Sequence, residues 1–377
     1  MFVMNPGTAT IIDLPGSISR LALKDRALVS KIFDVRSSVG RLIYPENPEV
    51  VKGYGQRDQV ITQKIIKVTN KVTYEGALFN ELRSRRPFQT REKIDLEAEL
   101  NKTEGCFFCI PKAYYVTPGD SFLVQGRLKH DTCFTASNPG KYDGYHGLII
   151  FDDHSPFTFG DFPDRLDCAI EWAREAQKED EEAIYFFFMW NCLWKAGGSI
   201  IHGHNQMSLS KGMHYGKIEH LLKAAGDYEG DYFEDLYKAH EVLGLGFVCG
   251  GGRIMAHLTP IKEKEVMVIS RTMDDVKSAV PKILECFYNL GVRSFNLALI
   301  CPPSTIFEGI PDEEVERWKD LPIIVRIVDR GDLMNRTADF GAMELYASSV
   351  ISSDPFRVAE ALGKAFDLKE TKSSINR

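Results

Sequence analysis

Two histidines and a glutamine recur at every second position in residues 199–206, which read SIIHGHNQ. Side chains on a strand point alternately to its two faces, so we expect His202, His204 and Gln206 on one face. A lone buried histidine is most often an imidazole with satisfied hydrogen bonds, but a cluster of polar groups is costly to bury unless it binds something. This spacing beside a glycine-rich turn therefore indicates metal ligands, a catalytic pair, or both.

A second chemical motif is the C-x-x-C formed by Cys106 and Cys109 in GCFFCI. Two thiolates at this spacing can share one zinc ion, and the same spacing also serves redox chemistry. A redox motif is expected where a strand gives way to a helix, whereas the flanks here are LNKTEG and IPKAYY, so metal binding is favoured. The remaining cysteines stand singly among apolar residues and are predicted to be buried small hydrophobes: Cys133, Cys168, Cys192, Cys249, Cys286 and Cys301.

The bulk composition restricts the classes of partner. The chain has 377 residues, enough for two domains or one duplicated domain, and its net charge of −7 provides no general basic field for nucleic acid or membrane surfaces. Any anionic substrate must be held by local positive charge. We expect a cytoplasmic protein, because the N-terminal residues lack a secretory pattern and no apolar run approaches a membrane span. Without such a signal, eight cysteines do not indicate a disulfide framework.

The elements that must position these residues follow an order that occurs twice. Each copy is predicted to run strand, helix, strand, connecting loop and strand. The duplication leaves the His-x-His-x-Gln residues in the first copy only, so the second copy is expected to serve mainly as a scaffold. The predicted elements are residues 146–151, a helix from Pro163, 184–190 and 199–210, then 265–270, 273–290, 294–300 and 322–330.

Three further segments complete the expected organisation. A helix is predicted near residues 20–35, and the alternation over 59–76 indicates a strand or hairpin. The glycine run CGGGR at 249–253 lacks the ending of a P-loop and the spacing of a dinucleotide fingerprint, so a turn is predicted there.

The segment NCLWKAGGSIIHGHNQ resembles the active-site segment of galactose-1-phosphate uridylyltransferases and their relatives in the histidine triad superfamily. The resemblance covers roughly residues 83 to 365. It implies an α+β protein with a duplicated histidine-triad-like fold, in which antiparallel sheets are flanked by helices. The implied domains are an N-terminal extension (1–82), a catalytic half with a zinc site (83–212) and a second half (213–377). The matching positions are Asn191, Gly197, Ser199, His202, His204 and Gln206.

The resemblance also implies a structural zinc ion. CFFC matches the zinc pair of the zinc-bearing relatives, and GYHGLIIFDDHSPFTFGD matches a strand whose trailing histidine is the third ligand. The implied ligands are Cys106, Cys109, His154 and His202. Four protein ligands leave no open coordination position, which is typical of a structural site.

With His202 on the metal, the resemblance makes His204 the nucleophile toward phosphorus and Gln206 a donor to the transferring group. RSRRPFQ resembles the start of the family's nucleotide site, and RGDLMNRTADFGAMELYASSV resembles its last segment, which completes the sugar-phosphate site across a subunit boundary and implies a homodimer. The substrate-binding residues that follow are Arg83, Arg86, Asn138, Asn191, Gly197, Ser199 and Glu344.

Three functions remain open at this point. The leading hypothesis is a nucleotidyltransferase acting between a nucleotide sugar and a sugar 1-phosphate. A phosphorylase would use the same histidine intermediate and release it to inorganic phosphate, as in the ADP-glucose, GDP-galactose and dinucleoside polyphosphate phosphorylases that the chain also resembles. The family often has proline between the two histidines, and Gly203 here is a departure shared by several phosphorylase-type relatives. The third hypothesis is a hydrolase or a nucleotide-binding protein without turnover.

Overall fold

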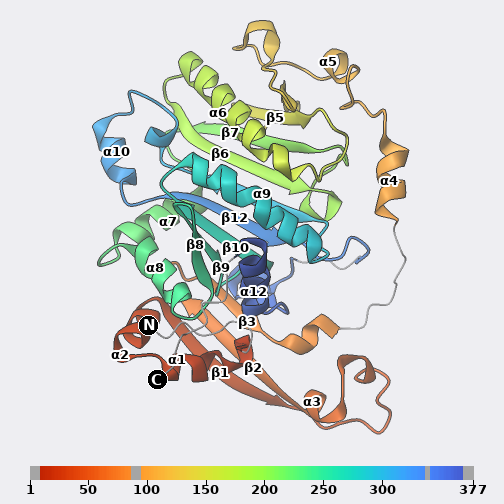
Figure 1. The fold of residues 1–377 in the computed structure, drawn as a ribbon, viewed down its shortest axis with the longest axis vertical. Helices are drawn as coiled ribbons and strands as arrows, with labels where there is room; N and C mark the ends of the chain where they lie inside the picture. The colour runs from red at the N-terminus through yellow and green to blue at the C-terminus, as the bar shows by residue number, and fades with distance from the viewer. Residues whose placement is uncertain (1–8, 86–94, 336–339, 368–377) are drawn as a thin grey trace.

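The computed structural model describes residues 9–85, 95–335 and 340–367, whose strands form one large and one small sheet (Figure 1). The large sheet is antiparallel throughout and has nine strands within the described ranges. Their spatial order is β4 (Cys133–Ser137), β5 (Tyr145–Phe151), β7 (His204–Lys211), β6 (Ala183–Cys192), β11 (Phe295–Ile300), β12 (Ile323–Asp329), β10 (Glu263–Ser270), β9 (Gly252–Ala256) and β8 (Gly246–Cys249).

This strand order reads as a pseudo-twofold arrangement about the β6–β11 pair. In each copy the third strand of the chain lies between the first and the second, as β5-β7-β6 and as β10-β12-β11. The two sets extend in opposite directions from the β6–β11 pair. Both predicted copies of strand, helix, strand and strand are therefore present. The domain boundaries at 82/83 and 212/213 stay a prediction.

Helices α6 (Phe162–Glu179) and α9 (Met273–Asn289) occupy equivalent places in the two copies and lie against the same side of the sheet in Figure 1. Pro163 stands in the first turn of α6, where its missing N–H costs no hydrogen bond, and the Thr272 side chain caps α9 by accepting from the Asp275 N–H. Their apolar faces are buried in the main core. On the opposite side of the sheet, a smaller apolar cluster that includes Phe108 packs on β4 and β5.

The small sheet contains β1 (Phe33–Arg41), β2 (Thr62–Asn70), β3 (Gly76–Phe79) and β13 (Ser349–Ile351). The strand predicted over 59–76 is confirmed as β2, and the helix predicted near 20–35 ends at Ile32, where β1 begins. β13 pairs in parallel with β3, so a late segment of the chain completes the N-terminal sheet.

The other helices connect these sheets or cover their edges. They are α1 (Leu14–Arg20), α2 (Leu23–Ile32), α3 (Arg57–Ile61), α4 (Leu96–Thr103), α5 (Ala113–Val116), α7 (Gly216–Gly226), α8 (Tyr232–Glu241), α10 (Asp312–Trp318), α11 (Met343–Tyr346) and α12 (Pro355–Ala365).

Two sequence predictions require correction. The strand predicted over 199–210 begins only at His204, because the Gly203 N–H donates to the His154 carbonyl and not to Phe151, the residue opposite it on β5. His202 therefore precedes the strand. Cys249 is half-buried rather than buried, since it lies at the exposed β8–β9 turn, whereas the other five isolated cysteines are buried. The glycine run forms that turn, as predicted.

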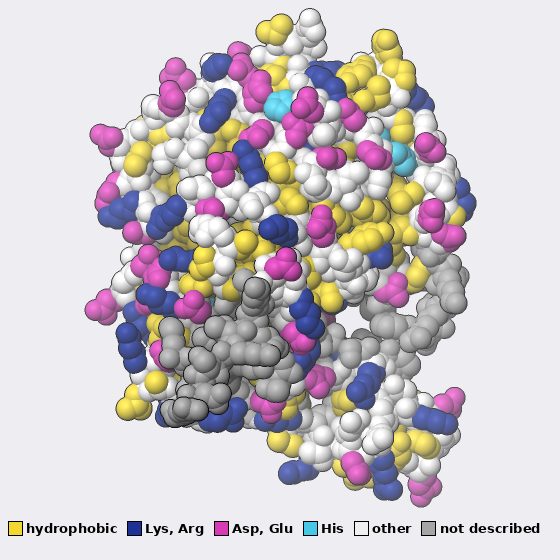
Figure 2. All heavy atoms as spheres, in the orientation of Figure 1, with side chains coloured by type: hydrophobic (Ala, Val, Ile, Leu, Met, Phe, Trp, Pro, Cys, Tyr) yellow, Lys and Arg dark blue, Asp and Glu magenta, His cyan; other side chains and the backbone are white. Residues whose placement is uncertain are grey.

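Acidic and basic side chains are interspersed over the face shown in Figure 2, with no large area of one sign. Within residues 9–85, 95–335 and 340–367, no helix is long and apolar enough to cross a membrane.

Candidate functional site

Four side chains from three separate segments converge into a cluster beside the start of β7. Cys106 and Cys109 come from the connection between α4 and α5, His154 follows β5, and His202 precedes β7. Their potential ligand atoms all lie within 4.8 Å of one another. This C-x-x-C lies between two helices rather than at a strand–helix junction, which agrees with the expectation of metal binding over redox chemistry.

The edges of this cluster have the lengths of a tetrahedral coordination shell. The two Sγ atoms are 3.8 Å apart, three Sγ–Nδ1 separations run from 3.3 to 3.6 Å, and the Nδ1 atoms of His154 and His202 are 3.1 Å apart. An ion bound at about 2.3 Å from sulfur and about 2.0–2.1 Å from nitrogen requires edges of about 3.8, 3.5 and 3.3 Å.

The hydrogen bonds of the two imidazoles provide an independent test of this fit. His202 Nε2 lies 2.8 Å from the Phe151 carbonyl oxygen, which can only accept, so Nε2 carries the proton. His154 Nε2 is 3.0 Å from Thr103 Oγ1, whose own hydrogen is directed at backbone carbonyls of α4. Both Nδ1 atoms therefore present lone pairs to each other and to two sulfurs, an arrangement that repels itself unless a cation lies between them. The residues present fit a bound metal ion.

His204 is oriented by the segment that carries this cluster. Its Nδ1 lies 2.9 Å from the carbonyl oxygen of His202, so Nδ1 carries the proton and Nε2 keeps its lone pair. The side chain is 7% exposed, and burial lowers its pKa. The imidazole is therefore neutral and has a basic nitrogen available. Within the described residues no hydrogen bond engages Nε2.

Gln206 follows His204 on the same face of β7, and its side chain contacts residues of β5 and of the loop before it. Its Oε1 lies 3.0 Å from His146 Nε2 and 3.4 Å from the Tyr142 hydroxyl. Burial, opposed by the contact with Gln206, lowers the pKa of His146, so this histidine is neutral. Asn138 contacts the same Nε2 at 3.2 Å. The structure thus brings the predicted residues Asn138, Gln206 and His204 onto one surface.

Asn191 joins this surface from β6. Met189 pairs directly with Gln206, so Asn191, two residues further along β6, lies in line with His204 on antiparallel β7. The turn that follows contains Gly197, which has φ +91°, a left-handed conformation that glycine adopts without strain. Gly198 is packed so closely that a Cβ would lie 2.7 Å from the Asn191 carbonyl oxygen. Ser199 is exposed at the end of the turn.

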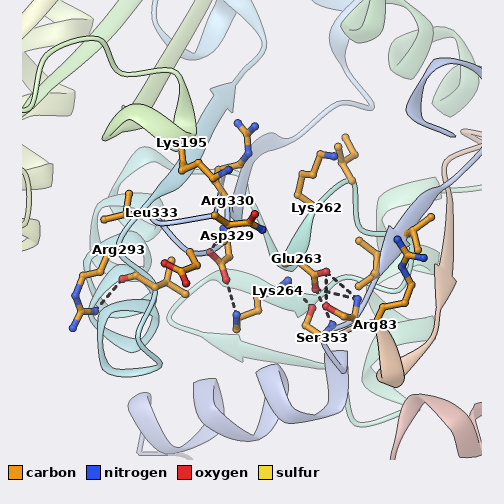
Figure 3. A pocket seen from close by; sticks show the side chains of 18 of the residues that line it. Arg83, Lys195, Lys262, Glu263, Lys264, Arg293, Asp329, Arg330, Leu333 and Ser353 are labelled. Atoms are coloured by element: carbon orange, nitrogen blue, oxygen red, sulfur yellow. Dashed lines mark hydrogen bonds and ion pairs between the residues drawn. The ribbon is translucent and has the colours of Figure 1, made fainter. Parts of the chain in front are cut away.

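Arg83 and Glu344 lie elsewhere. Both line a cavity of about 1040 Å³ that is edged by β10, the end of β12 and residues 341–344, and neither His204 nor Gln206 lines it (Figure 3). Glu344 Oε1 is 3.4 Å from Lys262 Nζ. Within this chain the structure does not bring Arg83 and Glu344 against His204, and Arg86 lies outside the described residues.

Sequence reasoning missed several residues that complete the surface. His146 and Tyr142 contact Gln206. From the second copy, Asn296 contacts Asn191, and Arg330 contacts Asn296. An isolated asparagine or arginine gives no spacing signal, so only strand pairing reveals the last two. Lys195, from the turn after β6, lines the cavity described above.

No protein-family model matches the chain, and no curated protein sequence matches it. Solved structures do match. ADP-glucose phosphorylase from Arabidopsis thaliana, with bound ADP-glucose, is similar with a TM-score of 0.53 and 16% identity over 77% of this chain and 95% of that chain. A uridylyltransferase structure has a TM-score of 0.51 and 14% identity over 81% and 99%. These likenesses show the fold alone, and they confirm the expected α+β class with antiparallel sheets flanked by helices.

Proposed function

We propose that this protein is a nucleotidyltransferase that moves a nucleoside monophosphate between a nucleotide sugar and a sugar 1-phosphate through a covalent nucleotidyl-His204 intermediate. The observation that carries the proposal is the fixed tautomer of His204. Its Nδ1–H donates to the His202 carbonyl, which leaves the Nε2 lone pair on the surface shared with Gln206 and Asn191. A neutral, oriented imidazole is a competent nucleophile toward phosphorus.

In the first step Nε2 attacks the α-phosphorus of the nucleotide sugar. An N–P bond forms, the P–O bond to the β-phosphate breaks, and the sugar 1-phosphate leaves with the bonding electron pair. The imidazole becomes positively charged, and its Nδ1–H bond to the His202 carbonyl offsets this charge. In the second step a phosphate oxygen of the acceptor attacks the same phosphorus and His204 departs neutral.

Gln206 and Asn191 are proposed to donate amide hydrogens to the non-bridging oxygens of the transferring group. Asn138, Gly197 and Ser199 are proposed as further contacts in the same surface. Removing one preorganised donor generally costs about 10²–10³ in rate, so Gln206→Ala should retain a slow reaction.

We propose that the Cys/His cluster holds structural zinc through Cys106, Cys109, His154 and His202. Thiolate and imidazole ligands suit Zn²⁺, and a set of four protein ligands leaves no position for substrate. The bound ion would supply only a crosslink. It would fix the backbone of residue 202, whose carbonyl orients His204.

Arg83 and Arg86 are proposed to offset charge on the diphosphate of the nucleotide sugar, and Glu344 is proposed to act at the sugar-phosphate end, across the boundary of a homodimer. The support is that Arg83 and Glu344 lie away from His204 within one chain, and that α11 exposes Leu345 and Tyr346 at 62% and 101% of their surface. A second copy would cover these side chains.

A phosphorylase is the second candidate. It would share every step up to the intermediate and would use inorganic phosphate as the acceptor. It is favoured by Gly203 and by the fold likeness to a protein named ADP-glucose phosphorylase, which contains bound ADP-glucose.

Intact-mass measurement tests the proposal directly. The purified protein is mixed in turn with UDP-glucose, ADP-glucose and GDP-mannose, and a gain of one nucleoside monophosphate is expected with the cognate donor. His204→Ala should gain nothing, whereas His220→Ala, a matched change at an exposed histidine of α7, should behave as wild type. Adding inorganic phosphate or a sugar 1-phosphate then shows which acceptor removes the adduct. Nucleotide binding without an adduct from any donor would contradict the enzyme and favour a binding protein.

A further inference from the structure

Asn191 and Asn296 face each other at the seam where the two copies join. β6 and β11 pair there, and these two asparagines are direct cross-strand partners. Asn296 Nδ2 donates to Asn191 Oδ1 at 2.7 Å and to the Ala196 carbonyl at 2.8 Å. Asn296 Oδ1 accepts a hydrogen bond from Arg330 Nη1, at the end of β12. A chain of bonds thus runs from the second copy to a residue of the candidate site.

The chemistry of the end groups fixes the direction of every bond in this chain. A guanidinium can only donate and a backbone carbonyl can only accept, so the amide of Asn296 has one orientation. Asn191 Oδ1 must then be the acceptor of the Asn296 amide hydrogen. Its Nδ2 points away from Asn296 and has no hydrogen-bond partner within the described residues.

We propose that Asn296, held by Arg330, is a positioning residue that keeps the –NH₂ of Asn191 directed at the transferring phosphoryl group. This inference rests on the proposed function. An asparagine that is free to rotate can present either its oxygen or its nitrogen, and an oxygen facing a phosphate repels it. Holding Oδ1 from behind removes that alternative before substrate binds.

The same bonds hold the turn after β6. The second hydrogen of the Asn296 amide is bound to the Ala196 carbonyl, directly before Gly197. The second copy, which lacks the His-x-His-x-Gln residues, therefore contributes to the site through Asn296 and Arg330. Gln206 is engaged in a comparable manner, because its Oε1 also contacts neighbouring side chains, at His146 and Tyr142.

Asn296→Asp separates positioning from packing. The carboxylate has the shape of the amide and retains Arg330 as a partner, but it has no hydrogen to donate to Asn191 Oδ1. Asn191 should then turn its –NH₂ toward the new carboxylate and its oxygen toward the substrate. We expect the rate of nucleotidyl-His204 formation in a single turnover to fall by about 10- to 100-fold, up to the effect of losing one donor.

A double-mutant cycle with Asn191→Ala is the decisive readout. If Asn296 acts through Asn191, then Asn296→Asp has no further effect on the adduct rate in the Asn191→Ala background. Ser294→Ala is the matched control, because it removes a 2.8 Å bond to the Cys192 carbonyl across the same seam without touching either asparagine. It should lower the thermal midpoint and leave the adduct rate unchanged.

The outcomes distinguish this inference from the proposed function. If the wild type forms the adduct and folded Asn296→Asp forms it equally fast, the inference is overturned and the proposed function stands. The same holds if Asn296→Asp lowers the adduct rate by the same factor in the wild-type and the Asn191→Ala backgrounds. If the wild type forms no adduct, the proposed function fails. In that case the affinity for the same nucleotide sugars, measured by calorimetry, replaces the adduct rate as the readout of the double-mutant cycle. Affinity losses that add in the double mutant would overturn the positioning role of Asn296, and so would a wild type that binds none of these nucleotide sugars.

Discussion

At the scale of single residues, the two histidines are distinguished by which nitrogen is protonated. His202 directs Nδ1 into the Cys/His cluster, because its Nε2–H is taken by the Phe151 carbonyl. His204 directs Nε2 outward, because its Nδ1–H is taken by the His202 carbonyl. Gly203 between them lies against Phe151, whose ring is buried and stacked beneath the Arg165 guanidinium at 3.3 Å from the ring centroid. Only a residue without a Cβ fits between the two histidines at this distance from the ring.

Gly203→Ala should therefore destabilise the protein and disturb both histidines. An added Cβ would lie 2.2 Å from Phe151 Cδ2 and 2.9 Å from the Ser155 carbonyl oxygen, and neither group can retreat. Overpacking of this kind costs about 1–3 kcal/mol. Denaturant unfolding with metal analysis checks it, with Gly216→Ala as the control, where a Cβ meets open space. Wild-type stability and full metal content in Gly203→Ala would show that the ring moves aside.

At the scale of elements, the Cys/His cluster ties together segments with little regular structure. The connection between α4 and α5 carries Cys106 and Cys109 and covers the small apolar cluster around Phe108 and Ile150 on the site side of the sheet. The Phe108 N–H donates to Cys106 Sγ at 3.3 Å, which stabilises negative charge on the sulfur. The apolar cluster beneath this connection is small, so we infer that a metal crosslink would add to its stability.

Cys106→Ser should lower zinc content from one ion per chain and open this connection to proteolysis. Three remaining ligands bind zinc less tightly, and residues between α4 and α5 then lose their main crosslink. Mass spectrometric metal analysis and limited trypsin digestion measure both effects. Cys249→Ser, at a half-buried cysteine outside the cluster, should change neither. Unchanged zinc stoichiometry in Cys106→Ser would refute the ligand assignment.

At the scale of the whole molecule, the small sheet is joined to the large sheet through partly buried polar groups. Arg326 on β12 pairs with Glu75, which precedes β3, and with Glu265 on β10. Burial acts to raise the pKa of the Glu75 carboxyl, but Arg326 and His257 hold this pKa at about 2. Nearby, His240 of α8 donates from Nδ1 to the Leu236 carbonyl and accepts at Nε2 from the Leu258 N–H, so it fits only as a neutral ring. Its ring stacks on His257 at 5.3 Å.

Stability should fall as the pH decreases below about 6.5. Burial lowers the pKa of His240 from 6.5 to about 3, so between these values the unfolded chain binds a proton that the folded chain does not. Unfolding is then favoured by acid, with a slope of at most about 1.4 kcal/mol per pH unit for each such proton. His240→Gln, which keeps a donor and an acceptor, should reduce this slope between pH 6.5 and 3. Identical slopes in denaturant titrations of both proteins would show that His240 does not carry the dependence.

The sequence by itself determined the candidate residues and most of the elements. The His-x-His-x-Gln spacing, the C-x-x-C and the repeated strand–helix–strand order depend on local periodicity and residue type, which a linear sequence records. The α+β fold and the convergence of Cys106, Cys109, His154 and His202 were implied by the resemblance that these motifs carry, and the structure shows both.

Only the tertiary structure decided how these residues are oriented and which partners hold them. The pairing of β6 with β11 brings Asn296 to Asn191 across 105 residues of chain, and Arg330 contacts Asn296 from the end of β12. No local pattern signals such contacts between distant strands. The start of β7 at His204 also depends on the loop after β5, because the His154 carbonyl in this loop accepts a hydrogen bond from the Gly203 N–H. The direction of a hydrogen bond depends on which groups the fold brings next to each other. The protonated nitrogen of each imidazole and the orientation of each side-chain amide therefore follow from the fold and not from the spacing of residues in the sequence.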